Sequence, residues 1–248
     1  MSVASLNAEL ARNFNQFARE AINESEAVRN ALRVEDQKYL ESFKMLCAFR
    51  AFHDSIVAGE SDDAQGFYIE AHNDLLTAHV HATNGMWRSS FKSLRSFLEN
   101  FLSFLYYKDH PIELQLWKTG KFRIGAAELR KYVSAHPLVV NSSLAKSAVD
   151  SIESDYAKLS ISVHASRVDY RMTAQNAYPS LSSASKVSLG QWLSQERSVI
   201  RLAIVLMLVI YQKQLRGAGS RGLRTIAGLV LSADKKARVM TELAIRLQ

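Results

Sequence analysis

The sequence predicts an all-α protein: a bundle of about eight to ten helices with a basic helical tail at its C-terminal end. Only three prolines and ten glycines interrupt the 248 residues, and good helix formers dominate the chain. Apolar residues recur at helical spacing along most of its length, so each predicted helix has a face to bury. With 48% hydrophobic residues, the chain can bury one large core or two modest ones.

Residues 1–63 are predicted to form N-terminal helices that pack on the bundle. A long amphipathic helix is expected over residues 3–33, and its thin apolar stripe can pack on the protein body or on a second subunit. A second helix is expected over residues 37–58, and the glycine and polar residues that follow it indicate a loop.

Residues 64–215 are predicted to form the bundle itself. The stretch 87–107 is its expected central helix, because apolar and aromatic side chains cover most of its surface. The residues between 165 and 185 are rich in Ser, Ala and Asn and predict a partly ordered connection. The other helices of the bundle are expected over residues 64–82, 112–118, 126–135, 143–163 and 189–215.

Residues 216–248 are predicted to form the basic tail, with helices over 223–231 and 233–247. From Lys213 to Gln248 there are eight basic residues against two acidic ones, so most of the chain's formal charge of +7 lies here. Such a segment is either a solvated helical surface or a contact patch for nucleic acid or an acidic partner. The candidate binding residues of this patch are Arg221, Arg224, Lys235, Lys236 and Arg238.

The composition also predicts a cytoplasmic protein. Its single cysteine, Cys47, stands in an apolar setting that is typical of a core residue, and no disulfide can form within the chain. The polar start of the chain does not look like a signal peptide. The most hydrophobic run, 202–211, is about half the length that a membrane span needs, so no membrane partner is expected.

Common cofactor and metal motifs are missing from the sequence. There is no Walker loop, dinucleotide-binding glycine pattern, CxxC pair or GxSxG elbow. Three histidines fall in the helix expected over 64–82, and their spacing matches no established metal motif. We therefore expect neither a cofactor nor a metal ion.

Two stretches carry residues suited to chemistry. The central helix holds Arg88, seven residues before Arg95, and then Glu99 and Asn100, so the two arginines lie on nearly the same side and Arg95 can pair with Glu99. Residues 155–166 place a tyrosine, a serine and a histidine four residues apart on one helical face. The histidine, His164, can transfer protons or can cap the end of the helix.

These two patterns, R…RxxxEN and then YxxLSxxVHxS, resemble the HEPN-like helical proteins of prokaryotes, which recur in toxin–antitoxin, abortive-infection and other antiphage systems. The resemblance covers roughly residues 66–215. It implies an up-and-down helical bundle that forms a homodimer, and in active members a metal-independent RNase. In those members an Arg and a His of an Rx4–6H motif from each subunit meet at the dimer interface.

The resemblance leaves the site residues open between two sets. A composite site would use Arg95, Glu99 and Asn100 near His164. The alternative is Arg130 with His136, the one segment with the family's motif spacing, which lies earlier in the chain than the family's pattern has it. A general base must take the proton of the ribose 2′-OH, an acid must protonate the 5′ leaving oxygen, and an Arg must stabilise the charge on phosphorus. A buried polar network between helices is the alternative reading of the composite set.

The sequence therefore predicts a cytoplasmic HEPN-like defence or toxin component that acts on RNA as a homodimer. The second hypothesis is a non-catalytic helical module that binds a partner protein or nucleic acid in such a system. A third is a ligand-responsive regulator, in which residues 198–211 would line a pocket or a dimer interface.

Overall fold

The computed structural model describes residues 3–164, 182–216 and 220–248, and over these ranges the chain is helical with no strand. The predicted all-α fold class is confirmed. The helices, with two short 3-10 turns labelled η, are in chain order α1 (Val3–Leu32), η1 (Arg33–Glu35), α2 (Asp36–Ser55), η2 (Val57–Gly59), α3 (Asp62–Thr83), α4 (Trp87–Tyr107), α5 (Pro111–Lys118), α6 (Ala126–Ala135), α7 (Pro137–Val140), α8 (Ser143–Val149), α9 (Ile152–Val163), α10 (Lys186–Ile210), α11 (Gln212–Leu215), α12 (Arg221–Val230) and α13 (Ala233–Leu243).

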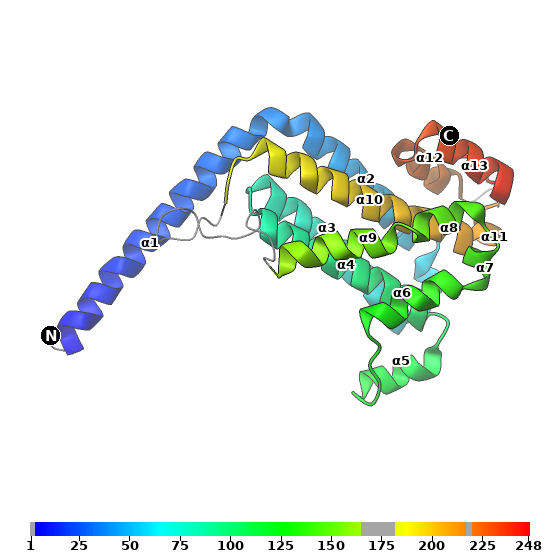
Figure 1. Cartoon of the computed structure of the whole chain (residues 1–248), viewed down its shortest axis with the longest axis horizontal. Helices are drawn as coiled ribbons and strands as arrows, with labels where there is room; N and C mark the ends of the chain where they lie inside the picture. The colour runs from blue at the N-terminus through cyan, green and yellow to red at the C-terminus, as the bar shows by residue number, and fades with distance from the viewer. Residues whose placement is uncertain (1–2, 165–181, 217–219) are drawn as a thin grey trace.

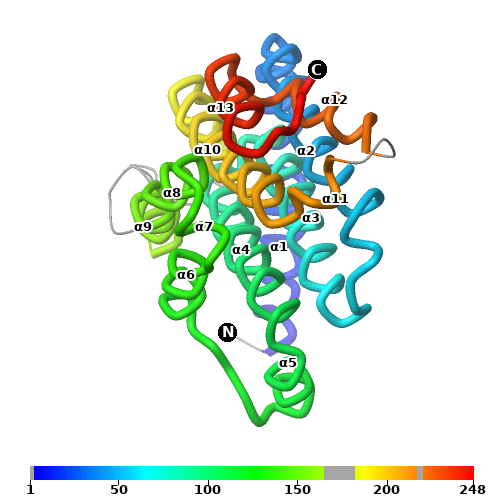
Figure 2. Tube along the Cα trace, turned by 90° about the vertical axis from the view of Figure 1, so that its right-hand side faces the viewer, coloured from blue at the N-terminus to red at the C-terminus, as the bar shows by residue number. Residues whose placement is uncertain are grey.

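The central position expected for residues 87–107 is confirmed by α4. This helix packs against α3, α6, α9 and α10, which surround it in Figure 2. Its aromatic residues Phe97, Phe101 and Phe104 are fully buried. An aromatic helix of this kind is stable in water only with neighbours on most of its surface, and the surrounding helices provide them.

The apolar run 202–211 lies in α10 and the residue that follows it, and all of it except the partly buried Ile210 is buried in the protein core. Ser185 begins this helix as an N-cap, because its side chain accepts a hydrogen bond from the backbone N–H of Ser188. Among the residues placed in the structure, no helix is both long enough and apolar enough to span a membrane.

Several predicted helix boundaries are wrong. The helix expected over 189–215 is divided at Tyr211 into α10 and α11, and the helix expected over 233–247 ends at Leu243. The helix expected over 143–163 is divided into α8 and α9, because the Ser151 hydroxyl donates to the carbonyl of Ala148 and competes there with the helical pattern. Pro137 begins a further helix, α7, which was not predicted. A proline is tolerated at the first helical position, where its missing N–H would have no partner within the helix.

The three predicted segments share one core. A single cluster of buried side chains extends from Leu32 to Ile245, and α2 packs against α3, α10 and α12. Cys47, expected in the core, is partly buried on α2. Residues 1–63, 64–215 and 216–248 therefore contribute to a common interior.

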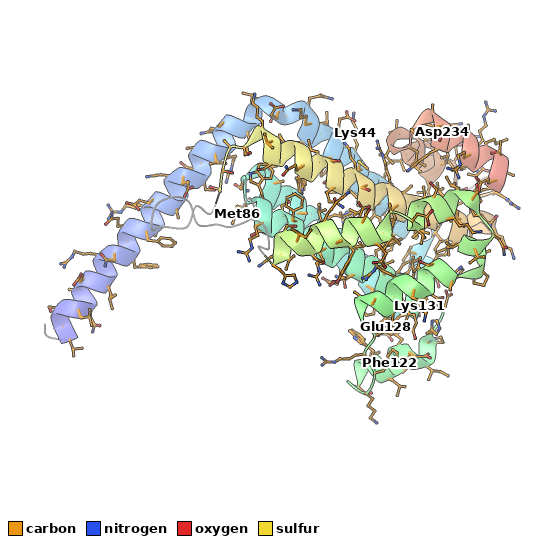
Figure 3. All side chains as sticks on the ribbon, viewed as in Figure 1. Lys44, Met86, Phe122, Glu128, Lys131 and Asp234 are labelled. Atoms are coloured by element: carbon orange, nitrogen blue, oxygen red, sulfur yellow. The ribbon has the colours of Figure 1, made fainter. Side chains whose placement is uncertain are left out.

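The first helix differs from the rest. Only Leu32 of α1 is buried, and the helix extends away from the body towards the N-terminus (Figure 1). Figure 3 shows side chains projecting from both sides of α1 along most of its length. Its apolar stripe is exposed at Leu6, Leu10, Phe14 and Phe17. The expected packing of the N-terminal helices on the bundle is therefore seen for α2 and only for the end of α1. The predicted connection over 165–185 lies outside the described residues up to 181.

Candidate functional site

Arg95, Glu99 and Tyr156 form a closed hydrogen-bonded triangle between α4 and α9. Arg95 Nε donates to Glu99 Oε1 at 2.9 Å, one helical turn away. Arg95 Nη2 donates to the Tyr156 hydroxyl at 2.8 Å, and that hydroxyl donates to Glu99 Oε1, also at 2.8 Å. The Arg95 and Glu99 side chains are 23% and 38% exposed, so the triangle lies at the surface.

His164 stands at the edge of this triangle. It is exposed and follows directly after α9, and its backbone N–H caps that helix by donating to the Ser160 carbonyl. Its Nε2 lies 3.4 Å from Arg95 Nη1. Arg88, two turns before Arg95 on α4, donates to the carbonyl of Val163 at 3.0 Å. The two arginines of the central helix thus both contact the C-terminal end of α9, next to the imidazole.

The pKa shifts of Tyr156 and Arg95 keep both groups protonated in the triangle. Burial raises the pKa of Tyr156, and its bond to Glu99 raises the pKa further, so the hydroxyl stays protonated and donates. Burial is the largest single effect on Arg95 and opposes its charge, but the hydrogen bond and charge of Glu99, together with Tyr156, outweigh it and the pKa of Arg95 rises. The charged carboxylate and guanidinium therefore hold each other in place. His164 belongs to this cluster but lies outside the triangle, and its imidazole is exposed.

Arg130 extends the cluster from a third helix, α6. Its guanidinium carbon lies 4.1 Å from the centre of the Tyr156 ring, on which Arg95 also packs at 5.0 Å. Arg130 Nε donates to Glu153 Oε1 at 2.7 Å. A tyrosine ring between two guanidinium groups is a favourable cation–π arrangement, and both cations are balanced by carboxylates.

Asn100 does not join the other members of the composite site. Its side-chain amide donates to Asp74 Oδ2 on α3 at 2.8 Å. Burial raises the pKa of Asp74, which the bonds from Asn100 and Ser96 partly offset. The residue next to Glu99 in sequence points to a different face of α4, because successive side chains of a helix are about 100° apart.

The alternative pair Arg130 and His136 is also separated. His136 caps α7, since its Nδ1 accepts the backbone N–H of Leu138 at 3.2 Å. Its Nε2 lies 3.5 Å from Asp109 Oδ2, and burial lowers its pKa. Tyr132 donates to the same Asp109 carboxylate. His136 therefore belongs to a separate network that joins α6 to the end of α4, whereas Arg130 faces α9.

The predicted basic residues of the tail have several different partners. Arg238 contacts Ser143 and Glu242, and Arg224 donates to the carbonyl of Leu215. Arg221 is exposed at the start of α12, and Lys236 is partly exposed on α13. Lys235 borders a cavity beside α10. The five residues thus lie on two helices, α12 and α13, and differ in their partners.

Two histidines of α2 and α3 contact neighbouring side chains. His79 Nδ1 lies 2.9 Å from the Ser42 hydroxyl, which donates to Glu196 in the core. His53 Nδ1 contacts Asp54 at 2.9 Å. Over the ranges that the structure covers, no group of three or more His, Cys, Asp or Glu side chains is arranged to hold a metal ion.

Sequence reasoning missed Glu153, Arg197 and Arg201. Glu153 lies three residues before Tyr156, on the same helical face, which is the feature that points to it. Arg197 and Arg201 are four residues apart, with Ser194 and Ser198 at the same spacing. This makes a polar stripe on an otherwise apolar helix, and it indicates a surface that does not face the core.

Arg95, Tyr156 and His164 together can bind a phosphate group and transfer a proton next to it. The remaining guanidinium N–H groups can contact an anion, and an imidazole nitrogen can accept or donate a proton. No protein-family model matches the chain, and comparisons with curated proteins and with solved structures find no significant match.

Proposed function

We propose that this chain is a component of a prokaryotic antiviral defence or toxin system and cleaves RNA without a metal ion at the surface formed by Arg95, Tyr156 and His164. One observation supports the proposal most. Arg95 and His164 are 69 residues apart in sequence, yet their side chains approach to 3.4 Å at an exposed position. The resemblance of the two motifs to HEPN-like proteins supports the same assignment. The single cysteine fits a cytoplasmic location.

The proposed reaction needs one proton carrier and one phosphate ligand. His164 takes the proton of a ribose 2′-OH, and the 2′ oxygen attacks phosphorus to form a 2′,3′-cyclic phosphate. The same imidazole, now protonated, gives its proton to the departing 5′ oxygen. Arg95 offsets the extra negative charge on the phosphate oxygens, and its bonds to Glu99 and Tyr156 keep it in place for this task.

The proposed active form is a homodimer joined through α1. The exposed stripe has intervals of 4, 4, 3 and 4 residues from Leu6 to Ala21, so it reads nearly the same in both directions. In an antiparallel pair, Leu6 would face Ala21 and Leu10 would face Phe17 of a second copy. These pairs bring apolar side chains of the two helices together, so the exposed stripe of each copy would be buried. A chain that begins at residue 24 should be monomeric by analytical ultracentrifugation, whereas the full chain should be dimeric.

The test of cleavage is incubation of the purified full chain with a fluorescent single-stranded RNA in EDTA. His164→Ala should abolish cleavage, and Arg95→Lys should reduce it at least tenfold, because lysine cannot reproduce the geometry of the guanidinium. His136→Ala is the matched control, since it removes a histidine from the separate Asp109 network. Circular dichroism should show that all variants remain helical.

The products give a second readout. Cleavage by this route leaves a 2′,3′-cyclic phosphate and a 5′-hydroxyl, which mass spectrometry identifies. Loss of activity in His136→Ala with full activity in His164→Ala would move the site to the alternative pair. RNA that remains intact under all conditions would refute catalysis.

The alternative is a helical module that binds a partner protein or nucleic acid without cleaving it. The pairing of the cations favours this reading: Arg95, Arg130 and Arg88 each already contact a carboxylate or a carbonyl. Under this alternative the RNA is bound in the same assay but stays intact. His164→Ala then leaves the affinity unchanged, while Arg95→Lys and Arg130→Gln act through the stability of the fold.

A further inference from the structure

A cavity of about 640 Å³ lies beside α10, on a different surface from the Arg95 cluster. Helices α2, α8, α10 and α13 supply most of its walls. Four basic side chains and four serines border it, together with a few small and apolar residues. No acidic residue lines it among residues 3–164, 182–216 and 220–248. The basic residues are Lys38, Arg197, Arg201 and Lys235, and the serines are Ser147, Ser151, Ser194 and Ser198.

The exposed side of α10 forms the floor of this cavity. Ser194, Arg197 and Arg201 follow each other at intervals of three and four residues and so share one helical face. Neighbours such as Val199 and Ile200 point to the opposite side and are fully buried in the core. The packing of α10 therefore fixes the direction in which its two arginines point.

The cations of the cavity are only partly neutralised. Arg201 Nε donates to the backbone carbonyl of Val230 at 3.0 Å, which orients the guanidinium. Among the described residues, no carboxylate forms an ion pair with Arg201. Arg197 makes no ion pair and no hydrogen bond within the ranges that the structure covers. Lys38 is paired with Glu35 at 2.7 Å. Burial and then the charge of Arg197 lower the pKa of Arg201, and burial and then Arg201 lower the pKa of Lys235.

The nearby carboxylates do not line the cavity, although Glu41 on α2 interacts with the charge of Arg197. Asp155 accepts a hydrogen bond from the Ser198 hydroxyl at 2.7 Å and is itself buried. Asp234, labelled in Figure 3 at the start of α13, is exposed and does not line the cavity. A bound anion would therefore reduce the mutual repulsion of the lining cations.

We propose that this cavity binds a nucleoside polyphosphate. Two guanidinium groups and a lysine on facing helices suit phosphate oxygens, because arginine binds phosphate through two parallel hydrogen bonds and lysine as a point charge. The hydroxyls of Ser147 and Ser194 add donors, whereas those of Ser151 and Ser198 already donate within the protein. Leu193, Leu202 and Ala148 give an apolar area for a base. The volume lies in the range of about 300–1,000 Å³ that is typical of small-molecule sites. The basic side chains converge on one cavity, and this favours a compact ligand over an extended nucleic-acid strand.

The test is isothermal titration calorimetry of the full chain with ATP in EDTA, compared with adenosine at the same ionic strength. ATP should bind, and adenosine should bind at least a hundredfold more weakly, because it lacks the phosphates. Arg197→Gln and Lys235→Gln should each weaken ATP binding at least tenfold. Lys236→Gln is the matched control: it removes the same charge from the next residue of α13, which does not line the cavity.

Several outcomes would overturn the proposal. One is the absence of heat or thermal stabilisation with 1 mM ATP, and another is equal weakening by Lys236→Gln and Lys235→Gln, which would mean general surface attraction. Displacement of ATP by a twelve-nucleotide single-stranded RNA that binds more tightly would assign the cavity to a nucleic-acid surface instead. Variants that keep the helical content and melting temperature of the wild type make loss of binding interpretable. The outcome is independent of RNA cleavage, which is lost through His164→Ala and not through Arg197→Gln.

Discussion

The hydroxyl of Tyr156 donates to Glu99 and accepts from Arg95, so one oxygen atom connects α9 to both charges of the α4 ion pair. An ion pair at the surface contributes little by itself, since solvent screens it. A hydroxyl placed between the two charges adds directional bonds, and the helices can satisfy them in one relative position only.

Removal of this hydroxyl should therefore weaken the fold. We expect Tyr156→Phe to lower the free energy of unfolding by about 1 kcal/mol, the usual contribution of one hydrogen bond, as measured by urea denaturation. The matched control is Tyr106→Phe, because the Tyr106 hydroxyl has no hydrogen bond among the residues that the structure describes. A double-mutant cycle with Glu99→Gln should show coupling between Tyr156 and Glu99. Additive effects would mean that the two side chains do not interact in solution.

Glu196 provides a second prediction at the residue scale. Its side chain is fully buried, and burial raises its pKa to about 8, although the Ser42 bond and the charge of Arg197 act in the other direction. Between the ordinary pKa of a glutamate and pH 8, the unfolded chain loses this proton while the native protein keeps it. The free energy of unfolding should therefore fall as the pH rises through this window.

The measurement is urea denaturation of the wild type and of Glu196→Gln at pH 5, 6, 7 and 8. The variant cannot ionise there, so the wild type should lose stability relative to it by an amount on the order of a few kcal/mol across the window. Glu41→Gln, which removes a carboxylate from the protein surface, should keep the wild-type decrease. Parallel pH profiles of the wild type and Glu196→Gln would show that Glu196 is ionised in the native protein.

At the scale of elements, helix positions follow from the sequence, whereas their ends depend on contacts that no local pattern contains. The apolar spacing of 87–107 predicts α4 and its central place, because such a surface must be buried. The division of 143–163 was missed because it depends on how Ser151 bonds its own backbone. The exposure of α1 was left open, because an amphipathic stripe indicates that a helix has a partner without indicating which one.

Helix α12 offers a test of contacts between elements. A Cβ added to Gly228 would lie 2.0 Å from the backbone oxygen of Gln248, which packs over this helix. We expect Gly228→Ala to displace the last residues and to lower the stability by about 1–3 kcal/mol, the usual cost of overpacking. Gly66→Ala in α3 is the matched control, since no atom lies within 4 Å of its added Cβ. It should raise the stability by up to about 1 kcal/mol through helix propensity. Similar melting temperatures for the two variants would contradict the packing at Gly228.

At the scale of the whole molecule, the sites depend on contacts between distant segments. Both Arg95 and His164 were candidates from the sequence, but their approach required α4 and α9 to pack side by side. Asn100 and His136 were equally good candidates from their neighbours in sequence, but in the structure they bond to other groups. The cavity beside α10 was not predicted at all, because Lys38, Arg197 and Lys235 come from three separate parts of the chain. The spacing of residues along one helix can be read from the sequence, whereas the contacts between helices depend on how the core packs.

The common core leads to a prediction about unfolding. Segments 1–63, 64–215 and 216–248 all place side chains in one buried cluster, so the loss of any segment exposes apolar surface on the others. We expect calorimetry to show a single transition, with equal calorimetric and van't Hoff enthalpies. Phe49→Ala in α2 and Leu243→Ala in α13 each remove a buried side chain, at costs of about 3–5 and 2–5 kcal/mol. Both should shift the same transition to lower temperature without dividing it. If the basic tail were an independent domain, Leu243→Ala would instead produce an early transition for residues 216–248 and leave the main transition at its wild-type temperature.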